Sequence, residues 1–340
     1  MYKKLLKLSI ASGFLLATPW AHAQVAPDPV QYVITPDVPG PNQQVTIEAQ
    51  GLGTFLGNAT IIWKKDGQVV QSGAGLRTYS FITGAVGSIT KVRVDIQSPT
   101  EGTYGKDFVF RPSLVNLVWE ADTWAPPLYR GKPLYSAGSP LKVAAFPMVI
   151  INNAQVAASS LSYQWTRNDE PLPAQSGLGR NTLSFDGDQL QAQETIAVDV
   201  YFGTSLVGRG GVVIPVSQPQ VVLYERDSLR GVLYDLALPS SLSLSTKEIT
   251  IAAQPYNFSR VSVIGGAVQY EWTLSGEGIA GPDSSHGILT LRQTGTGTGS
   301  AALEVSLQNN NQNQLVQAAQ TVLGILFGQP GSATASFFGI

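Results

Sequence analysis

The sequence predicts an all-β protein whose chain forms three tandem β-sandwich modules in an elongated array. A lone Trp stands in an alternating apolar run at Trp63, Trp165 and Trp272, at intervals of about 105 residues. Each Trp is followed at nearly equal distances by two further alternating runs, and no apolar period of 3.6 residues persists for three turns. The 35 Gly and 21 Pro residues suit short strands joined by many turns.

The N-terminal residues 1–23 are predicted to be a signal peptide. Three lysines precede an apolar run of about ten residues, and Ala21-His22-Ala23 has the small-x-small form that signal peptidase cleaves. The apolar run is too short to cross a hydrocarbon layer of about 30 Å as a helix. We therefore expect an exported protein that is periplasmic, cell-surface or extracellular and has no transmembrane span in its mature chain.

Module one is expected over residues 24–112. Alternation predicts one strand before the Trp strand and several after it, and Asp66-Gly67 predicts a type I′ hairpin that follows the Trp strand. The expected strands are residues 44–49, 59–63, 68–71, 78–82, 91–96 and 107–110.

Modules two and three are expected over residues 113–217 and 218–328, with the same order of strands. In each module an alternating triplet after the Trp, such as Ile196, Val198 and Val200, points to one buried sheet face. The expected strands of module two are residues 141–146, 161–165, 181–185, 195–201 and 211–215. Those of module three are residues 248–253, 268–273, 287–291, 301–307 and 317–327.

A second repeat is expected at the module junctions. The segment from Trp119 to Tyr129 matches the segment from Tyr224 to Tyr234, and both precede a Pro-bearing stretch and the next core strand. We interpret these segments as short apolar linkers that pack neighbouring modules against each other. Three modules of about 30–40 Å each would then form a rod on the order of 100 Å long.

The last predicted segment is a C-terminal tail, residues 329–340. It ends in Phe337-Phe338-Gly339-Ile340, after Pro330 and Gly331. An apolar tail of this kind can dock on its own module or add to the sheet edge of a partner.

Two stretches around the Trp residues resemble a known family. Tyr163 to Asp169 (YQWTRND) and Ile62 to Gly67 (IWKKDG) resemble the Trp strand and hairpin of bacterial immunoglobulin-like domains, which overlap with the polycystic-kidney-disease type of sandwich. Trp119 to Lys132 resembles a signature of exported bacterial proteins built from such modules. The resemblance implies three immunoglobulin-like sandwiches. No Cys pair flanks the Trp, and Val94-Asp95-Ile96 stands where a tyrosine corner would be.

Charge and Cys usage exclude several classes of partner and site. Without the three lysines of residues 1–23, the 21 basic residues become 18, against 23 acidic residues. No basic field remains for nucleic acid. With no Cys, each module of about 100 residues must be held by burial of its core alone. Thiolate metal sites are also unavailable, and we expect no cofactor.

Histidine is the first test of an enzymatic reading, and only His286 remains after residue 23. Asp283, Ser284, Ser285 and His286 contain the letters of a catalytic triad. Neighbouring residues of one turn cannot orient a base toward a nucleophile, so we expect a solvated turn and no enzyme.

Four carboxylates form a candidate weak calcium site, because calcium needs only oxygen ligands. The alternative is that they face solvent and pair with Arg130 or Arg230. The four residues are Glu120, Asp122, Glu225 and Asp227.

Four aromatic residues near the first junction are candidate ligand-binding residues: Trp119, Trp124, Tyr129 and Tyr135. Exposed aromatic rings could stack on sugars. The alternative is that they fill the space between modules one and two.

The sequence therefore favours a non-enzymatic exported protein that acts as a structural, spacer or adhesion element of the cell surface or envelope. Its expected partner is an envelope or surface protein, or a glycan. The alternative function is an array of carbohydrate-binding modules that uses the junction aromatics.

Overall fold

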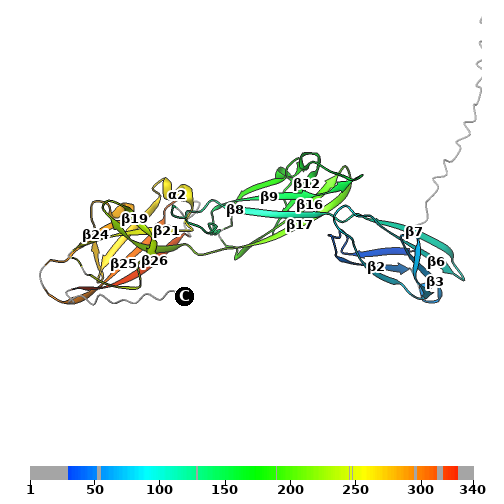
Figure 1. The fold of residues 1–340 in the computed structure, drawn as a ribbon, viewed down its shortest axis with the longest axis horizontal. Coiled ribbons are helices and arrows are strands. Elements are labelled where there is room, and N and C mark those ends of the chain that lie inside the picture. Colours follow the sequence, from blue (N-terminus) through cyan, green and yellow to red (C-terminus); the bar gives the residue numbers. More distant parts are fainter. Residues whose placement is uncertain are drawn as a thin grey trace, which may run out of the picture.

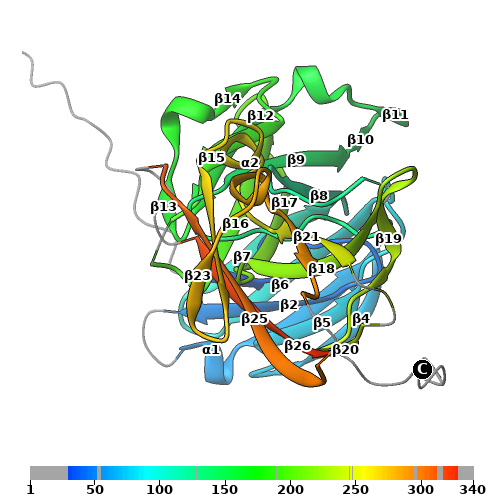
Figure 2. The same ribbon diagram turned by 90° about the vertical axis from the view of Figure 1, so that its left-hand side faces the viewer.

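A computed structural model describes residues 30–51, 55–127, 129–188, 190–244, 246, 248–294, 297–311 and 317–327. Figure 1 shows three β-rich bodies one after another along the long axis, and Figure 2 looks along that axis from the module-three end. The predicted all-β tandem array is confirmed. The predicted signal peptide, residues 1–23, and tail, residues 329–340, lie outside the described residues. None of the helices in the described part has the length and apolar composition needed to cross a membrane.

Module one is a sandwich of a three-stranded and a four-stranded sheet. The first sheet has the order β1 (Val30–Thr35), β2 (Gln44–Gly51), β5 (Thr78–Ile82). The second has the order β4 (Gln68–Ala74), β3 (Thr60–Lys65), β6 (Thr90–Ser98), β7 (Gly102–Phe110), and the short helix α1 (Phe55–Asn58) precedes β3. Positive φ angles at Asp66 (50°) and Gly67 (85°) agree with the predicted type I′ turn.

Module two repeats this plan. One sheet has the order β15 (Thr182–Asp186), β9 (Pro140–Met148), β8 (Leu114–Ala121). The other has the order β13 (Glu170–Pro171), β12 (Ser162–Arg167), β16 (Gln193–Phe202), β17 (Ser205–Pro215), and β14 (Gly177–Leu178) pairs with the other end of β12. A small hairpin, β10 (Ile150–Ile151) with β11 (Ala154–Gln155), and two 3-10 turns, η1 (Ala158–Ser160) and η2 (Pro173–Gln175), lie in the loops.

The first sheet of module three has four strands, one more than the first sheets of modules one and two. One sheet has the order β19 (Gly231–Ala237), β18 (Gln220–Asp227), β21 (Glu248–Tyr256), β24 (Ile288–Arg292). The other has the order β20 (Ser241–Ser243), β26 (Ala318–Phe327), β25 (Gly299–Asn309), β22 (Val268–Leu274), β23 (Glu277–Ile279). Helix α2 (Arg260–Ile264) follows β21, and the 3-10 turn η3 (Ser284–His286) precedes β24.

The three Trp residues have the same structural role in their modules. Trp63, Trp165 and Trp272 lie in separate buried cores, at most 4% exposed. Each indole N–H donates to a backbone carbonyl just before β5, β15 or β24. The acceptors are Leu76 (2.8 Å), Arg180 (2.8 Å) and Ser284 (3.0 Å). Because a buried indole N–H needs a partner, this bond joins the core to the loop before that strand.

The predicted junction linkers are wrong. Trp119 and Tyr224 lie inside β8 and β18, which are the first strands of modules two and three. The matching segments therefore begin as equivalent strands of two sandwiches. The first then continues into the loop that follows β8, and the second into β19. The first strand of module one, β1, was also absent from the expected set. Both β1 and β8 are edge strands whose alternation is carried by half-buried side chains, so their signal is weak.

Candidate functional site at the junction of modules two and three

The loop between β8 and β9, residues 122–139, reaches across to module three. The backbone N–H of Trp124 donates to the Phe258 carbonyl (2.6 Å), and the N–H of Asn257 donates to the Trp124 carbonyl (2.9 Å). Thr123 and Ser259 form an isolated antiparallel bridge. The two modules are thus joined by backbone hydrogen bonds of the kind that hold a sheet together.

Gln317 sits at the centre of a buried polar network in the same interface. Its side-chain Nε2 donates to the hydroxyls of Ser136 (3.0 Å) and Ser139 (2.8 Å) of module two. Its Oε1 accepts from the Ser259 N–H (2.8 Å) and the Asn309 amide (2.9 Å) of module three. One amide therefore connects both modules, and removing it would take hydrogen bonds away from several buried polar groups at once.

Asn257 adds a second connection. Its side-chain Oδ1 accepts from the Leu134 N–H (3.2 Å), and its backbone carbonyl accepts from the Ser136 hydroxyl (2.6 Å). Neither Asn257 nor Gln317 was singled out from the sequence. Both lie in loops, where no apolar periodicity marks a residue as buried.

The four candidate aromatics lie near this second junction, not between modules one and two, so their predicted position is wrong. Tyr135 is completely buried in the module-two core. The Lys132 ammonium lies 3.1 Å from the ring centroid of Trp119, which is half-buried against the same core. Partial burial lowers the pKa of Lys132, while Glu120 opposes that shift. One face of Trp119 is therefore already occupied.

Trp124 and Tyr129 contact module three. The indole N–H of Trp124 is buried and has no hydrogen-bond partner among the described residues. Tyr129 packs edge-to-face on Tyr256 with ring centroids 5.7 Å apart, and it is 46% exposed. Of the four aromatics, Tyr129 alone combines a large exposed area with a ring not covered by a cation or by core.

The four candidate calcium ligands lie on two different modules. Glu120 lies opposite Lys142 in the β8–β9 register. Asp227 accepts from the backbone N–H groups of Leu229 and Arg230 and pairs with the Arg230 side chain at 3.7 Å. Within the part of the chain that the structure describes, no three acidic, His or Cys residues gather into a metal-binding group.

His286 lies in the exposed turn η3. Its Nδ1 is 3.3 Å from the Ser285 hydroxyl, while the Ser284 hydroxyl donates to the Gly281 carbonyl at 2.9 Å. Among the described residues no carboxylate hydrogen-bonds the imidazole, so nothing orients it as a general base.

Comparisons with known proteins find only distant structural likenesses. No protein-family model matches the chain, and no curated protein matches its sequence. Among solved structures, three N-terminal domains of the bacteriophage RB49 Highly Immunogenic Outer Capsid protein share 14% identity, with 88% of this chain and 97% of that chain covered and a TM-score of 0.26. The chain's own sheets decide the fold. This is a tandem array of immunoglobulin-like sandwiches.

Two further likenesses are of the same kind. The central fibronectin-III array of RIM-binding protein shares 10% identity, covers 90% and 98% of the two chains and has a TM-score of 0.28. The Bacteroides ovatus SGBP-B protein in complex with a mixed-linkage heptasaccharide shares 10% identity, covers 87% and 70%, and has a TM-score of 0.23. Likenesses this distant say nothing about ligands of the present array.

We call the backbone bonds of Trp124 and the Gln317 network together the clamp. Two grooves of about 680 Å³ flank this clamp. One is lined by residues of opposite charge, including Glu120, Asp122, Lys132 and Arg260. The other is formed by module three together with Trp124 and contains consecutive residues of β22, from Val268 to Glu271, and His286.

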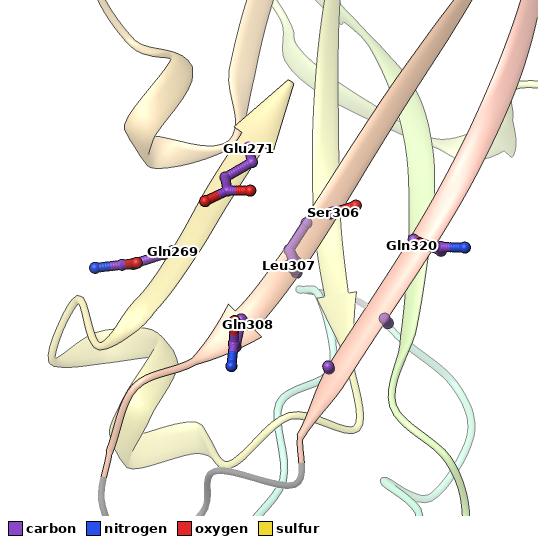
Figure 3. A pocket seen from close by; sticks show the side chains of 8 residues that line it. Gln269, Glu271, Ser306, Leu307, Gln308 and Gln320 are labelled. Carbon is purple, nitrogen blue, oxygen red and sulfur yellow. The ribbon is translucent and has the colours of Figure 1, made fainter. Parts of the chain in front are cut away.

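A smaller hollow of about 300 Å³ lies on the outer face of β22, β25 and β26. Figure 3 shows its polar side chains, Gln269, Glu271, Ser306, Gln308 and Gln320, carried by these three strands. It shares Gln269 and Glu271 with the larger groove, so the two hollows meet at β22.

Proposed function

We propose that the chain is a non-enzymatic exported protein that serves as a spacer or adhesion element at the cell surface or within an envelope assembly. Its modules span residues 24–112, 113–217 and 218–328. Residues 1–23 direct its export, and its partner is a surface or envelope protein or a glycan.

The observation that carries the proposal is the clamp between modules two and three. A spacer holds a distance only if its junctions resist bending, and modules joined by a short linker alone would move relative to each other. Here backbone bonds at Trp124 and the buried amide of Gln317 tie the modules together. This arrangement supports a stiff spacer segment formed by modules two and three rather than two independently moving domains.

The carbohydrate-binding alternative receives less support from the same residues. Tyr135 is buried, and Trp119 is covered on one face by Lys132. A stacking platform needs several exposed rings, and of the four candidate aromatics only Tyr129 offers one. On a glycan array we expect no binding, and binding that is lost in Tyr129→Ala would favour the alternative.

Small-angle scattering tests the spacer proposal directly. Gln317→Ala should lower the longest dimension and broaden the distance distribution, because the clamp loses the hydrogen bonds of Gln317 to three side chains and to the Ser259 N–H. Gln320→Ala, on the outer face of β26, is the matched control and should scatter like the unmodified chain. Thermal unfolding verifies that both variants fold. Identical scattering from the unmodified chain and Gln317→Ala would show that the clamp does not set the shape.

A further inference from the structure

The Trp strand of module one is covered along its whole outer edge. Strand β4 pairs with β3 from Thr60 to Lys65, including Ile61 opposite Gly73. Beyond the end of β4, the N–H of Gly75 donates to the Ala59 carbonyl at 3.1 Å. The positions two and four residues before Trp63 therefore have backbone partners on this side.

Module two covers the same edge with different elements. Tyr163, two residues before Trp165, pairs with Gly177 of β14. Leu161, four residues before Trp165, accepts from the Gly179 N–H at 2.8 Å. The Trp165 carbonyl itself accepts from the Leu172 N–H at 2.8 Å. Two short strands and a turn thus replace the long β4.

Module three leaves this edge open. Strand β23 pairs only with Trp272, Thr273 and Leu274. The chain then turns into η3, so the equivalents of the covered positions, Tyr270 and Val268, have no partner strand on that side. No hydrogen bond from any described residue reaches their backbone groups there.

The direction of these backbone groups follows from the hairpin. Ser275 (φ 51°) and Gly276 (φ 89°) form a two-residue turn, so Leu274 and Glu277 are its hydrogen-bonded closing pair. Hydrogen-bonded positions alternate along an antiparallel strand. Tyr270 and Val268, at even spacing from Leu274, therefore direct their N–H and C=O groups to the open edge.

The large groove of module three lies along this open edge. Its lining includes Val268, Gln269, Tyr270 and Glu271, with apolar residues of β21 and α2 and with Trp124 of module two. The Tyr270 ring packs against the core of module three, and this burial raises its pKa to about 12. No Lys or Arg lines the groove, and Glu271 is its one carboxylate. The groove thus suits an uncharged extended strand.

We propose that this edge receives an added β-strand, and that the strand is the segment of residues 332–340 from a second copy of the chain. The segment reads SATASFFGI, with no charged residue and no Pro. On an extended strand Ala333, Ala335 and Phe337 fall on one face, which suits the apolar side of the groove. Strand addition supplies main-chain hydrogen bonds to an open edge, and side chains at alternate positions supply specificity.

The sheet register favours a second copy over the chain's own tail. Ala319 and Tyr270 both pair with Leu307, so Phe327 lies eight residues beyond the level of Tyr270, or about 27 Å. Residues 328–340 span about 45 Å at most. Most of that length would be spent returning past β23, and too few residues would remain to pair. A donor strand from a neighbour has no such limit, and repeated addition builds an open chain of copies.

A synthetic peptide of residues 329–340 tests the acceptor edge, with a chain truncated after Gly328 as the receptor. Fluorescence anisotropy should show saturable binding, and a scrambled peptide should not bind. Val268→Pro removes an N–H that faces the groove without touching the β22–β25 bonds, and it should weaken binding at least tenfold. Val268→Ala keeps the N–H and should bind like the unmodified receptor. No peptide binding, or equal binding by a folded Val268→Pro variant, would overturn the proposal.

Sedimentation of residues 24–340 tests the second copy. The unmodified chain should associate with rising concentration, and truncation after Gly328 or Val268→Pro should each leave a monomer. Mixed together, these two variants should form a capped dimer, because one keeps the edge and the other keeps the strand. A chain that binds the peptide but stays monomeric at all concentrations would assign the edge to its own tail and overturn the proposal. The scattering test of the clamp is made on chains truncated after Gly328, so association through this edge does not affect it.

Discussion

At the scale of single residues, the most consequential group is a buried ion pair in module two. Glu194 is completely buried, and Arg167 binds it through two hydrogen bonds of 2.8 and 2.7 Å. Burial alone would raise the pKa of Glu194, but Arg167, the Asp188 N–H and the Asn168 amide together lower it. The sequence carried a signal for this residue, since Glu194 falls in phase with the inward triplet Ile196, Val198 and Val200.

Replacing Arg167 by Met should destabilise module two strongly. The variant leaves a buried carboxylate without its partner, so the free energy of unfolding should fall by about 3–5 kcal/mol at pH 7. Arg209→Met is the matched control, because Arg209 pairs with Asp37 and Asp199 at an exposed site and should cost only about 0–1 kcal/mol. Urea unfolding followed by fluorescence measures both variants.

The pH dependence of the same variant has a defined sign. In the unmodified chain the lowered pKa of Glu194 contributes stability that is present above the unfolded-state pKa and is lost as pH falls through the folded-state pKa. In Arg167→Met the Asp188 N–H and the Asn168 amide remain, but the guanidinium that opposes burial is gone, so the pKa of Glu194 rises relative to the unmodified chain and protonation near pH 4 relieves the buried charge. The loss of stability should therefore be smaller at pH 4 than at pH 7. An equal loss at both values would contradict this account.

At the scale of elements, alternation located the strands that bury one face fully. The Trp strands and the long strands that pair with them, β6, β16 and β25, overlap predicted strands, because buried side chains recur at alternate positions along them. The first strands were missed or interpreted as linkers. In β8 only Val115 is buried and the remaining residues are half-buried or exposed, so no strong alternation marks it.

The bond between each Trp and its loop is an element-scale device that can be tested. Trp165→Phe keeps an aromatic ring in the core but leaves the Arg180 carbonyl without its donor, so it should cost about 2 kcal/mol. Trp119→Phe is the control, since Trp119 is only half-buried, and it should cost less than about 1 kcal/mol. Thermal unfolding compares the two, and equal losses would show that the indole hydrogen bond is not what anchors the loop.

At the scale of the whole molecule, the two junctions are built differently. Modules two and three share backbone bonds and the Gln317 network. Modules one and two meet through the exposed Arg209–Asp37 pair (3.0 Å). A cavity of about 650 Å³ lies between them. Because an exposed ion pair stabilises little, bending should be concentrated at the first junction.

Spin labels can measure this difference, since the chain has no Cys of its own. Labels at the exposed positions Gln97 and Gln164 report on the first junction, and labels at Gln164 and Glu277 report on the second. The distance distribution should be broader for the first pair. Adding Gln317→Ala should broaden the second pair and leave the first unchanged. Distributions of equal width in the unmodified chain would contradict the proposed asymmetry.

The sequence by itself determined the all-β class, the threefold repeat and the central place of Trp63, Trp165 and Trp272, because burial on alternate positions is a local property of each strand. It did not place the aromatic residues or the clamp correctly. Gln317 and Ser136 are far apart in the chain, and only the packing of modules two and three brings them together. The open edge of β22 could not be predicted from the local sequence either. A missing partner strand becomes visible only when the sheets are assembled and the three modules are compared.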